Sequence, residues 1–239
     1  MKKIKILAIV STVFLVLIIA VFAVLAALGI FKIETDESGK SEIIFTPAEI
    51  KNKSLEWQTK ETEGDITAVF KTTAGKFEVK LSGSAAGEKF IELDNAGIFD
   101  GMEFSVLAEN MFIQTSPSGE SFSLEKTELI PINGAVGFVY EEEKASPSLV
   151  IITAKELSGI SEGFLSQSGF DEEKTGVYKT FGGVPELEGK IVVFGMVSSG
   201  AEVIEKISGG ENSGYTGGYS PLEPVKINSV EISFPTETN

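Results

Sequence analysis

The chain has 239 residues, of which 35 are acidic and 20 basic, and a formal net charge of −15. All twenty basic residues are lysine, and arginine, histidine and cysteine are absent. This composition excludes a disulfide framework, a serine–histidine triad, a cysteine nucleophile and the usual zinc sites.

The N-terminus combines a basic tip, residues 1–5, with an uncharged apolar run over residues 6–31. About 20 apolar helical residues span the hydrocarbon core of a bilayer, so this run predicts a transmembrane anchor. Three lysines precede the run and none lies within it, which predicts a cytoplasmic N-terminus and an extracytoplasmic remainder. That remainder has 17 lysines and 35 acidic residues, a net charge of −18, which argues against nucleic acid and anionic lipid surfaces as partners.

A cleaved signal peptide is the alternative interpretation of the same segment. The apolar part of a signal peptide usually has about 7–15 residues, fewer than this run, but Val24-Leu25-Ala26 would suit a small-residue cleavage site. The sequence therefore predicts a single-pass protein of the cell membrane, with secretion after cleavage as the alternative.

Residues 32–64 are predicted to form a juxtamembrane linker, in which residues 43–45 are a candidate short strand. Trp57 is the only tryptophan of the chain and lies among charged residues. We expect it to dock the linker onto the following domain. Residues 235–239 are predicted to be a polar tail.

From residue 65 the chain shows short apolar segments with strand periodicity. Phe77, Val79 and Leu81 alternate with charged residues, as a strand with one buried face requires. The expected strands are 67–73, 76–81, 103–108, 111–114, 134–140, 148–153, 191–197 and 225–232, and the expected helices are 84–95 and 201–207. Residues 154–185 are predicted to be an insertion or long loop. This pattern predicts a mainly β antiparallel barrel or sandwich with helices at its ends.

Several stretches carry recognisable motifs, namely residues 72–81, 88–93, 97–104, 110–114, 183–195, 200–207 and 221–227. In this order they resemble the cyclophilin-type peptidyl-prolyl cis-trans isomerases; residues 97–104, for example, are similar to the family's "GYYDG..F" and residues 110–114 to its "NFMIQ". The resemblance covers about residues 65–233. It implies a closed antiparallel β-barrel capped by two helices for a domain over residues 65–234, in a divergent, membrane-anchored bacterial form.

The departures from the family lie at the site that the resemblance implies. The family's "FHRV" supplies a catalytic arginine, and Val106 stands at that position here. The family's asparagine, glutamine, phenylalanine and histidine positions are aligned with Tyr140, Leu149, Ile151 and Ile191, respectively. Neither the catalytic arginine nor the histidine is retained, and of the polar set only Gln114 is.

Apolar side chains remain where the family places a proline-accepting floor, at Met111, Phe112, Ile151 and Leu187. Two interpretations stay open: a surviving proline-binding groove, or plain core residues in a filled pocket. The candidate groove residues are Val106, Met111, Phe112, Gln114, Tyr140, Leu149, Ile151, Leu187 and Ile191. The resemblance implies no cofactor, and no metal site is expected.

Three functions are consistent with this sequence. The first is an anchored, extracytoplasmic prolyl isomerase that assists the folding of exported proteins, with activity weakened by Val106. The second is a binding module of the same fold that holds extended or proline-containing segments without useful turnover. The third is a passive structural domain of an envelope assembly.

Overall fold

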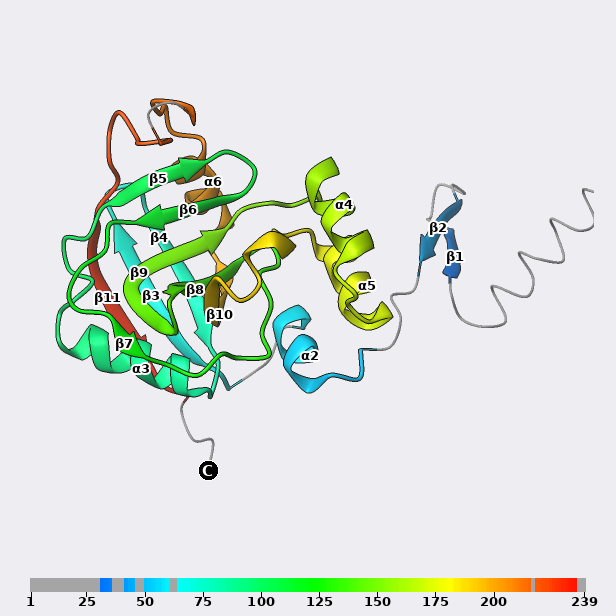
Figure 1. Cartoon of the computed structure of the whole chain (residues 1–239), viewed down its shortest axis with the longest axis horizontal. Coiled ribbons are helices and arrows are strands. Elements are labelled where there is room, and N and C mark those ends of the chain that lie inside the picture. The colour runs from blue at the N-terminus through cyan, green and yellow to red at the C-terminus, as the bar shows by residue number, and fades with distance from the viewer. Residues whose placement is uncertain (1–30, 36–40, 46–49, 61–63, 216–217, 236–239) are drawn as a thin grey trace, which may run out of the picture. The chain divides into compact units, whose positions relative to one another are not determined.

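The computed structural model describes residues 31–35, 41–45, 50–60, 64–215 and 218–235 (Figure 1). The chain divides into two units, residues 1–50 and 51–239. In the first unit, β1 (Phe31–Thr35) and β2 (Ser41–Phe45) form an antiparallel pair in which Phe31 lies opposite Phe45. The expected anchor lies outside the described residues, except that Phe31 begins β1. Among the described residues, none of the helices is long and apolar enough to cross a membrane.

The second unit is built on one curled antiparallel sheet of nine strands (Figure 1). Its strand order is β11-β3-β4-β10-β8-β9-β6-β5, and β7 pairs with β9 beside this path. The strands are β3 (Ile66–Thr72), β4 (Lys76–Leu81), β5 (Phe104–Ala108), β6 (Phe112–Thr115), β7 (Phe122–Ser123), β8 (Ala135–Glu141), β9 (Lys144–Ile152), β10 (Ile191–Ser199) and β11 (Ile227–Ser233).

The two edge strands meet only at a short bridge, so the expected closed barrel is replaced by a curled sheet. Glu103 and Lys226 form an isolated antiparallel bridge just before β5 and β11. On either side of it, the Phe104 N–H donates to the Val225 carbonyl at 2.9 Å, and the Ile227 N–H donates to the Met102 carbonyl at 2.8 Å.

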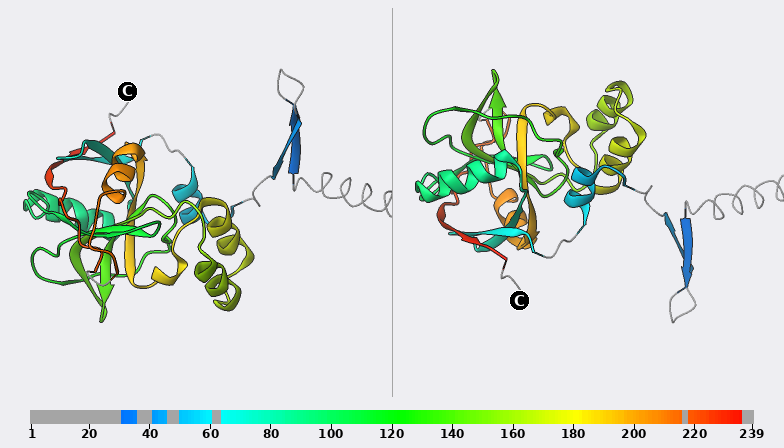
Figure 2. Two further views of the ribbon diagram at one scale, coloured as in Figure 1. Left: turned by 90° about the horizontal axis from the view of Figure 1, so that it is seen from above. Right: turned by 90° about the horizontal axis from the view of Figure 1, so that it is seen from below.

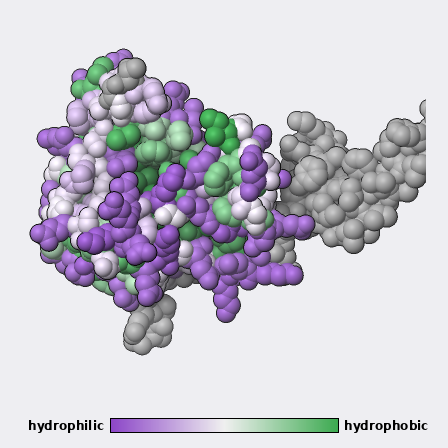
Figure 3. Space-filling view, in the orientation of Figure 1, coloured by the Kyte–Doolittle hydropathy of each residue, from purple (hydrophilic) through white to green (hydrophobic). Residues whose placement is uncertain are grey.

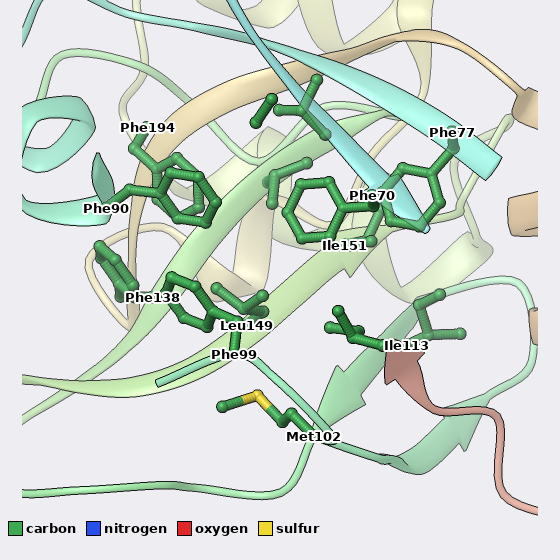
Figure 4. Close-up of a cluster of buried hydrophobic side chains, with 14 of the residues drawn as sticks. Phe70, Phe77, Phe90, Phe99, Met102, Ile113, Phe138, Leu149, Ile151 and Phe194 are labelled. Atoms are coloured by element: carbon green, nitrogen blue, oxygen red, sulfur yellow. The ribbon is translucent and has the colours of Figure 1, made fainter. Parts of the chain in front are cut away.

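The interior of the sheet is filled by aromatic side chains, shown in Figure 4. Phe90 lies at the centre, with its ring centroid 4.7 Å from that of Phe194 and 4.8 Å from that of Phe99. Phe70 and Phe77 stack at 4.7 Å. Such pairs stabilise a core beyond the area they bury.

The two helices expected from the sequence are confirmed. Helix α3 (Ala85–Asn95) begins at Ser84, whose side chain accepts a hydrogen bond from the Gly87 N–H and so satisfies one free donor of the first turn. Helix α6 (Ala201–Ser208) buries Val203, Ile204 and Ile207, the residues expected to face inward. In Figure 1, α3 lies at the lower end of the sheet and α6 at the upper end.

The prediction of a long loop over residues 154–185 is wrong. This segment forms α4 (Gly159–Gln167) and α5 (Glu172–Phe181), followed by the 3-10 turn η1 (Pro185–Leu187). Each helix is capped by a side chain, Ser158 and Asp171, which accept from the N–H groups of Ser161 and Lys174. Figure 2 shows the two helices side by side at one end of the domain.

A further helix, α2 (Lys53–Thr59), lies within the predicted linker and packs onto the domain. Gln58 is buried, and its side chain both donates to the Ile130 carbonyl and accepts from the Ile130 N–H, each at 2.8 Å. The Glu173 carboxylate of α5 accepts from the N–H groups of Lys51 and Asn52 at 2.7 Å. Helix α2 therefore joins the sheet to the inserted helices.

Candidate functional site

Three side chains from neighbouring strands share the outer face of the sheet. Val106 on β5 lies opposite Gln114 on β6, and Gln114 lies opposite Val150 on β9. Directly opposed residues of antiparallel strands point to the same side, so the three form one row. Figure 3 shows apolar side chains gathered on the face that carries the β5–β6 hairpin, bordered by polar ones.

The amide of Gln114 is held in place from the sheet side. Its Nε2 donates to Ser148 Oγ at 3.3 Å, and that hydroxyl in turn donates to the Thr115 carbonyl at 2.7 Å. Gln114 is half-buried, whereas Ser148 is almost fully buried. The row therefore offers one oriented polar group between two apolar side chains.

The β5–β6 turn adds two apolar residues to this region. Phe112 lies two residues before Gln114 on β6, on the same face, and is half-buried. Met111 precedes it and is 42% exposed. A ring and a flexible thioether beside an oriented amide are suited to contact with a pyrrolidine ring and the adjacent peptide group.

The row continues across β8 to β10. Gly137 lies opposite both Val150 and Val193, and a Cβ at Gly137 would lie only 2.8 Å from the Val192 carbonyl oxygen. Ile191 lies opposite Val139 and is 8% exposed, so its side chain is buried and offers little surface to a ligand.

The turn η1, which carries Leu187, is held by the inserted helices. On one side, Ser161 of α4 donates to the Glu186 carboxylate at 3.0 Å. On the other, the Glu188 carboxylate accepts from Lys174 Nζ at 2.5 Å and from the Tyr178 hydroxyl at 3.2 Å. Burial and the Glu188 charge raise the pKa of Tyr178 well above its usual range. The half-buried Leu187 thus lies between two carboxylates that α4 and α5 fix in place.

Comparison with known proteins identifies the family. Residues 67–232 match the model of the cyclophilin type peptidyl-prolyl cis-trans isomerase/CLD family. This chain belongs to that family. The cyclophilin-type resemblance expected from the motifs is therefore confirmed.

Individual cyclophilins are similar to this chain in sequence or fold. The peptidyl-prolyl cis-trans isomerase cypE of Dictyostelium discoideum is 28% identical over 167 residues, which cover 67% of this chain and 94% of that protein. A crystal structure of a Cryptosporidium parvum cyclophilin type isomerase has a TM-score of 0.53 at 14% identity, covering 71% of this chain and 98% of the other. The structure of the same isomerase with the dipeptide Ala-Pro has a TM-score of 0.51 at 15% identity, covering 70% and 98%. These structures support a mainly β, cyclophilin-like fold.

The structure places two of the expected groove residues elsewhere. Leu149 and Ile151 are each 1% exposed and belong to the core inside the sheet. Their neighbours Ser148 and Val150 are also buried, at 1% and 2% exposed, but the register with β6 places them on the face of Gln114. Strand side chains alternate, so an alignment displaced by one residue exchanges the inner and outer faces. Sequence reasoning missed Ser148 and Val150 for this reason, and only the pairing of Gln114 with Val150 in the folded sheet identifies their face.

Tyr140 also differs from its expected place in the groove. It is half-buried, packs partly against the core, and has Lys126 Nζ 5.1 Å from its ring centroid. The structure thus groups Val106, Phe112 and Gln114 with Val150, beside exposed Met111. The other two expected groove residues belong to other elements: Leu187 is the last residue of η1, and Ile191 is the first residue of β10. Among the described residues, no cluster of three or more acidic side chains is arranged to hold a metal ion.

Proposed function

We propose that this cyclophilin-type chain is a slow peptidyl-prolyl cis-trans isomerase that acts as a folding factor on the X-Pro bonds of exported proteins. The observation that carries this proposal is the outward, hydrogen-bonded Gln114, flanked in register by the apolar Val106 and Val150. Gln114 provides one donor and acceptor for a substrate backbone, and the half-buried Val106 and Phe112 provide an apolar surface for a prolyl ring. Val150 is 2% exposed and is a buried neighbour of Gln114 in the row.

The low turnover follows from the chemistry of the reaction. Rotation about a peptide bond has a barrier of about 18–20 kcal/mol because conjugation keeps the amide planar. A catalyst must bind the twisted amide more tightly than either planar form. In the family an arginine donates to the prolyl nitrogen and weakens this conjugation, whereas Val106 has no donor and the chain has no arginine at all. By analogy with lost oxyanion-hole donors, the expected loss of rate is about 10²–10³.

A lysine is a weak substitute for the missing group. Its ammonium is a strongly hydrated point charge, whereas a guanidinium presents a planar set of donors. A second candidate function is therefore a non-catalytic module of the same fold that binds proline-containing or extended segments. The apolar Val106 beside Gln114 favours it, because that pair retains the means to bind but lacks a donor for the twisted nitrogen.

Prolyl cis-trans exchange in an Ala-Pro-Phe-type peptide, followed by NMR with the full chain, separates these functions. Exchange above the uncatalysed rate supports the isomerase. Exchange at the uncatalysed rate together with peptide shift changes contradicts the isomerase and supports the binding module. If neither rate nor shifts change, both are refuted and the structural role expected as the third alternative takes their place.

Replacing Gln114 tests the residue that carries the proposal. We expect Gln114→Ala to lower catalysed exchange, or peptide affinity, about tenfold or more, because a charge-neutral hydrogen bond to the substrate backbone is lost. Gln167→Ala is the matched control, since Gln167 is exposed on α4 away from this face. Equal behaviour of the two variants would remove the basis of the proposal.

We also propose that residues 6–31 anchor the protein in the cell membrane with its folded domain outside the cytoplasm. The support is the length of the apolar run and the lysines before it. Carbonate extraction of membranes should leave the intact chain in the pellet and release a chain lacking residues 1–31. Recovery of a chain that has been cleaved near residue 26 in the soluble fraction would favour a cleaved signal peptide instead.

A further inference from the structure

A cavity of about 700 Å³ lies next to the candidate site, between the end of the β6–β9 pair, helix α6 and the segment that leads to α4. Ile152 of β9 and Asn110 of the β5–β6 turn line it from the sheet side, and Ile204 and Glu205 of α6 line the opposite side. It has no counterpart among the groove residues expected from the sequence.

The cavity belongs to the same face of the sheet as Gln114. Ile152 is the next residue after Val150 to point outward on β9, and it lies directly opposite Phe112. Residues two apart on a strand are separated by about 7 Å, so the cavity starts roughly two residues beyond Gln114 along the sheet. An extended chain with its proline at Gln114 would therefore reach the cavity with a residue about two to four positions away from that proline.

The lining indicates which side chains the cavity would accept. Its sheet side is apolar at Ile152, whereas Thr153 contributes a hydroxyl that is buried and has no hydrogen-bond partner among the described residues. Such a group is costly to leave unsatisfied, and a peptide carbonyl or N–H would satisfy it once the lining moves to open the hydroxyl to the cavity. Two of the charged lining residues, Lys155 and Glu205, form an exposed ion pair with each other. The third charged lining residue, Glu156, is exposed and leaves the lining with a net charge of −1. The cavity therefore disfavours anionic ligands and accepts an uncharged segment at its apolar side.

We propose that this cavity is a second substrate subsite, which binds an uncharged extended segment two to four residues away from the isomerised proline. This inference rests on the proposed function, because it takes Gln114 as the position of the prolyl bond. The subsite adds affinity for long polypeptides and leaves short peptides unaffected.

Peptide length provides the test. Anisotropy titrations with the full chain compare a labelled Ala-Pro-Phe peptide, which extends one residue to each side of the proline, with a longer peptide, in which uncharged residues extend this sequence on both sides. We expect the longer peptide to bind about tenfold more tightly, as one additional well-buried contact region allows. In Glu205→Trp, whose indole would occupy the cavity, this advantage should disappear while the affinity for the short peptide stays unchanged.

Glu202→Trp is the matched control, because it makes the same replacement on an exposed residue of α6 that does not line the cavity. It should retain the full advantage of the longer peptide. The inference is overturned if Glu205→Trp retains that advantage too, or if wild type binds both peptides equally. Failure of the short peptide to bind at all would instead refute the proposed function.

Thr153→Val provides a second measurement that does not depend on filling the cavity. The replacement keeps the branched shape and removes the hydroxyl. We expect a raised melting temperature of the free protein, because an unsatisfied buried group is lost, and a several-fold weaker affinity for the longer peptide. A higher melting temperature with undiminished affinity would mean that the hydroxyl does not contact the peptide, which contradicts the subsite.

Discussion

Val106 on β5 lies directly opposite Gln114 on β6. One substitution at Val106 can therefore place a hydrogen-bond donor beside Gln114, where the family has its arginine. Val106 is half-buried and points outward, which leaves a longer side chain room to reach past it. We expect Val106→Arg to raise kcat/KM for prolyl isomerisation about tenfold or more, because a guanidinium could donate to the prolyl nitrogen. NMR exchange rates with the full chain measure the effect.

The control for this gain is Val69→Arg. Val69 is also a half-buried strand valine, but it lies on β3 between Glu78 and Glu231, away from the row of Gln114. It adds the same charge without placing a donor at the site. A gain in both variants would be an effect of net charge, and no gain in correctly folded Val106→Arg would mean that the row does not align X-Pro bonds.

Tyr178 provides a residue-scale prediction about pH. Its phenol is buried and donates to Glu188, and burial together with that charge raises its pKa. In the unfolded chain the phenol titrates near pH 10, whereas in the folded state it keeps its proton to higher pH. Since the folded state then binds more protons, stability is fully present below about pH 10 and falls as the pH rises further.

Urea unfolding from about pH 8 to 11 checks this expectation. Tyr178→Phe should flatten the decline at the alkaline end, since phenylalanine has no proton to lose. Tyr215→Phe is the control and should follow wild type, because Tyr215 is 82% exposed. An identical alkaline decline in wild type and Tyr178→Phe would contradict the proposed cause.

At the scale of single residues, the resemblance placed Val106 and Gln114 in one candidate groove, and the structure shows them directly opposite each other on neighbouring strands. It misplaced Leu149 and Ile151 because four apolar residues in succession, from Leu149 to Ile152, hide the alternation. Only the pairing of Gln114 with Val150 sets the register, and pairing is a tertiary property.

At the scale of elements, α2 depends on one buried amide. Gln58 satisfies both the N–H and the carbonyl of Ile130, which are themselves buried. We expect Gln58→Ala to lower the free energy of unfolding by about 2 kcal/mol or more, because two backbone groups lose their partners. Denaturant titration measures the change, and Gln167→Ala on exposed α4 should stay within about 0.5 kcal/mol of wild type. A small effect of Gln58→Ala would show that water replaces the amide.

The helices differ in how far the sequence could predict them. Three of the eight residues of helix α6 are apolar and buried, and this apolar stripe was sufficient to predict the helix from the sequence. Helix α4 buries only Ser161 and Leu165, and α5 only Val177 and Tyr178, so neither has a stripe long enough to predict a helix. The capping residues Ser158 and Asp171 were the only other local indication of α4 and α5 in the sequence. The contacts that hold these two helices against η1 join residues far apart in the chain, so a local pattern does not reveal them.

At the scale of the whole molecule, the sequence predicted the antiparallel, mainly β architecture because most strands carry their own alternation. It predicted complete closure, whereas the edges meet at the Glu103–Lys226 bridge alone. That pair also forms an exposed ion pair at 2.8 Å, and the hydrogen bond that Lys226 donates to the Glu103 carboxylate raises the pKa of Lys226. How far two edge strands run together depends on the curl of the entire sheet, which no local pattern encodes.

The division of the chain predicts which part folds by itself. Residues 51–239 form one unit that contains α2, the sheet and the inserted helices. We expect this fragment to unfold cooperatively.

A fragment of residues 64–239 should melt about 10 °C lower, because it loses the burial of Leu55 and the bonds of Gln58, together about 3–5 kcal/mol. Lys80, which donates to the carbonyls of Trp57 and Lys60, would regain water and limit the loss. Calorimetry on both fragments decides whether α2 is part of the folded domain, and equal melting temperatures would assign it to the linker instead.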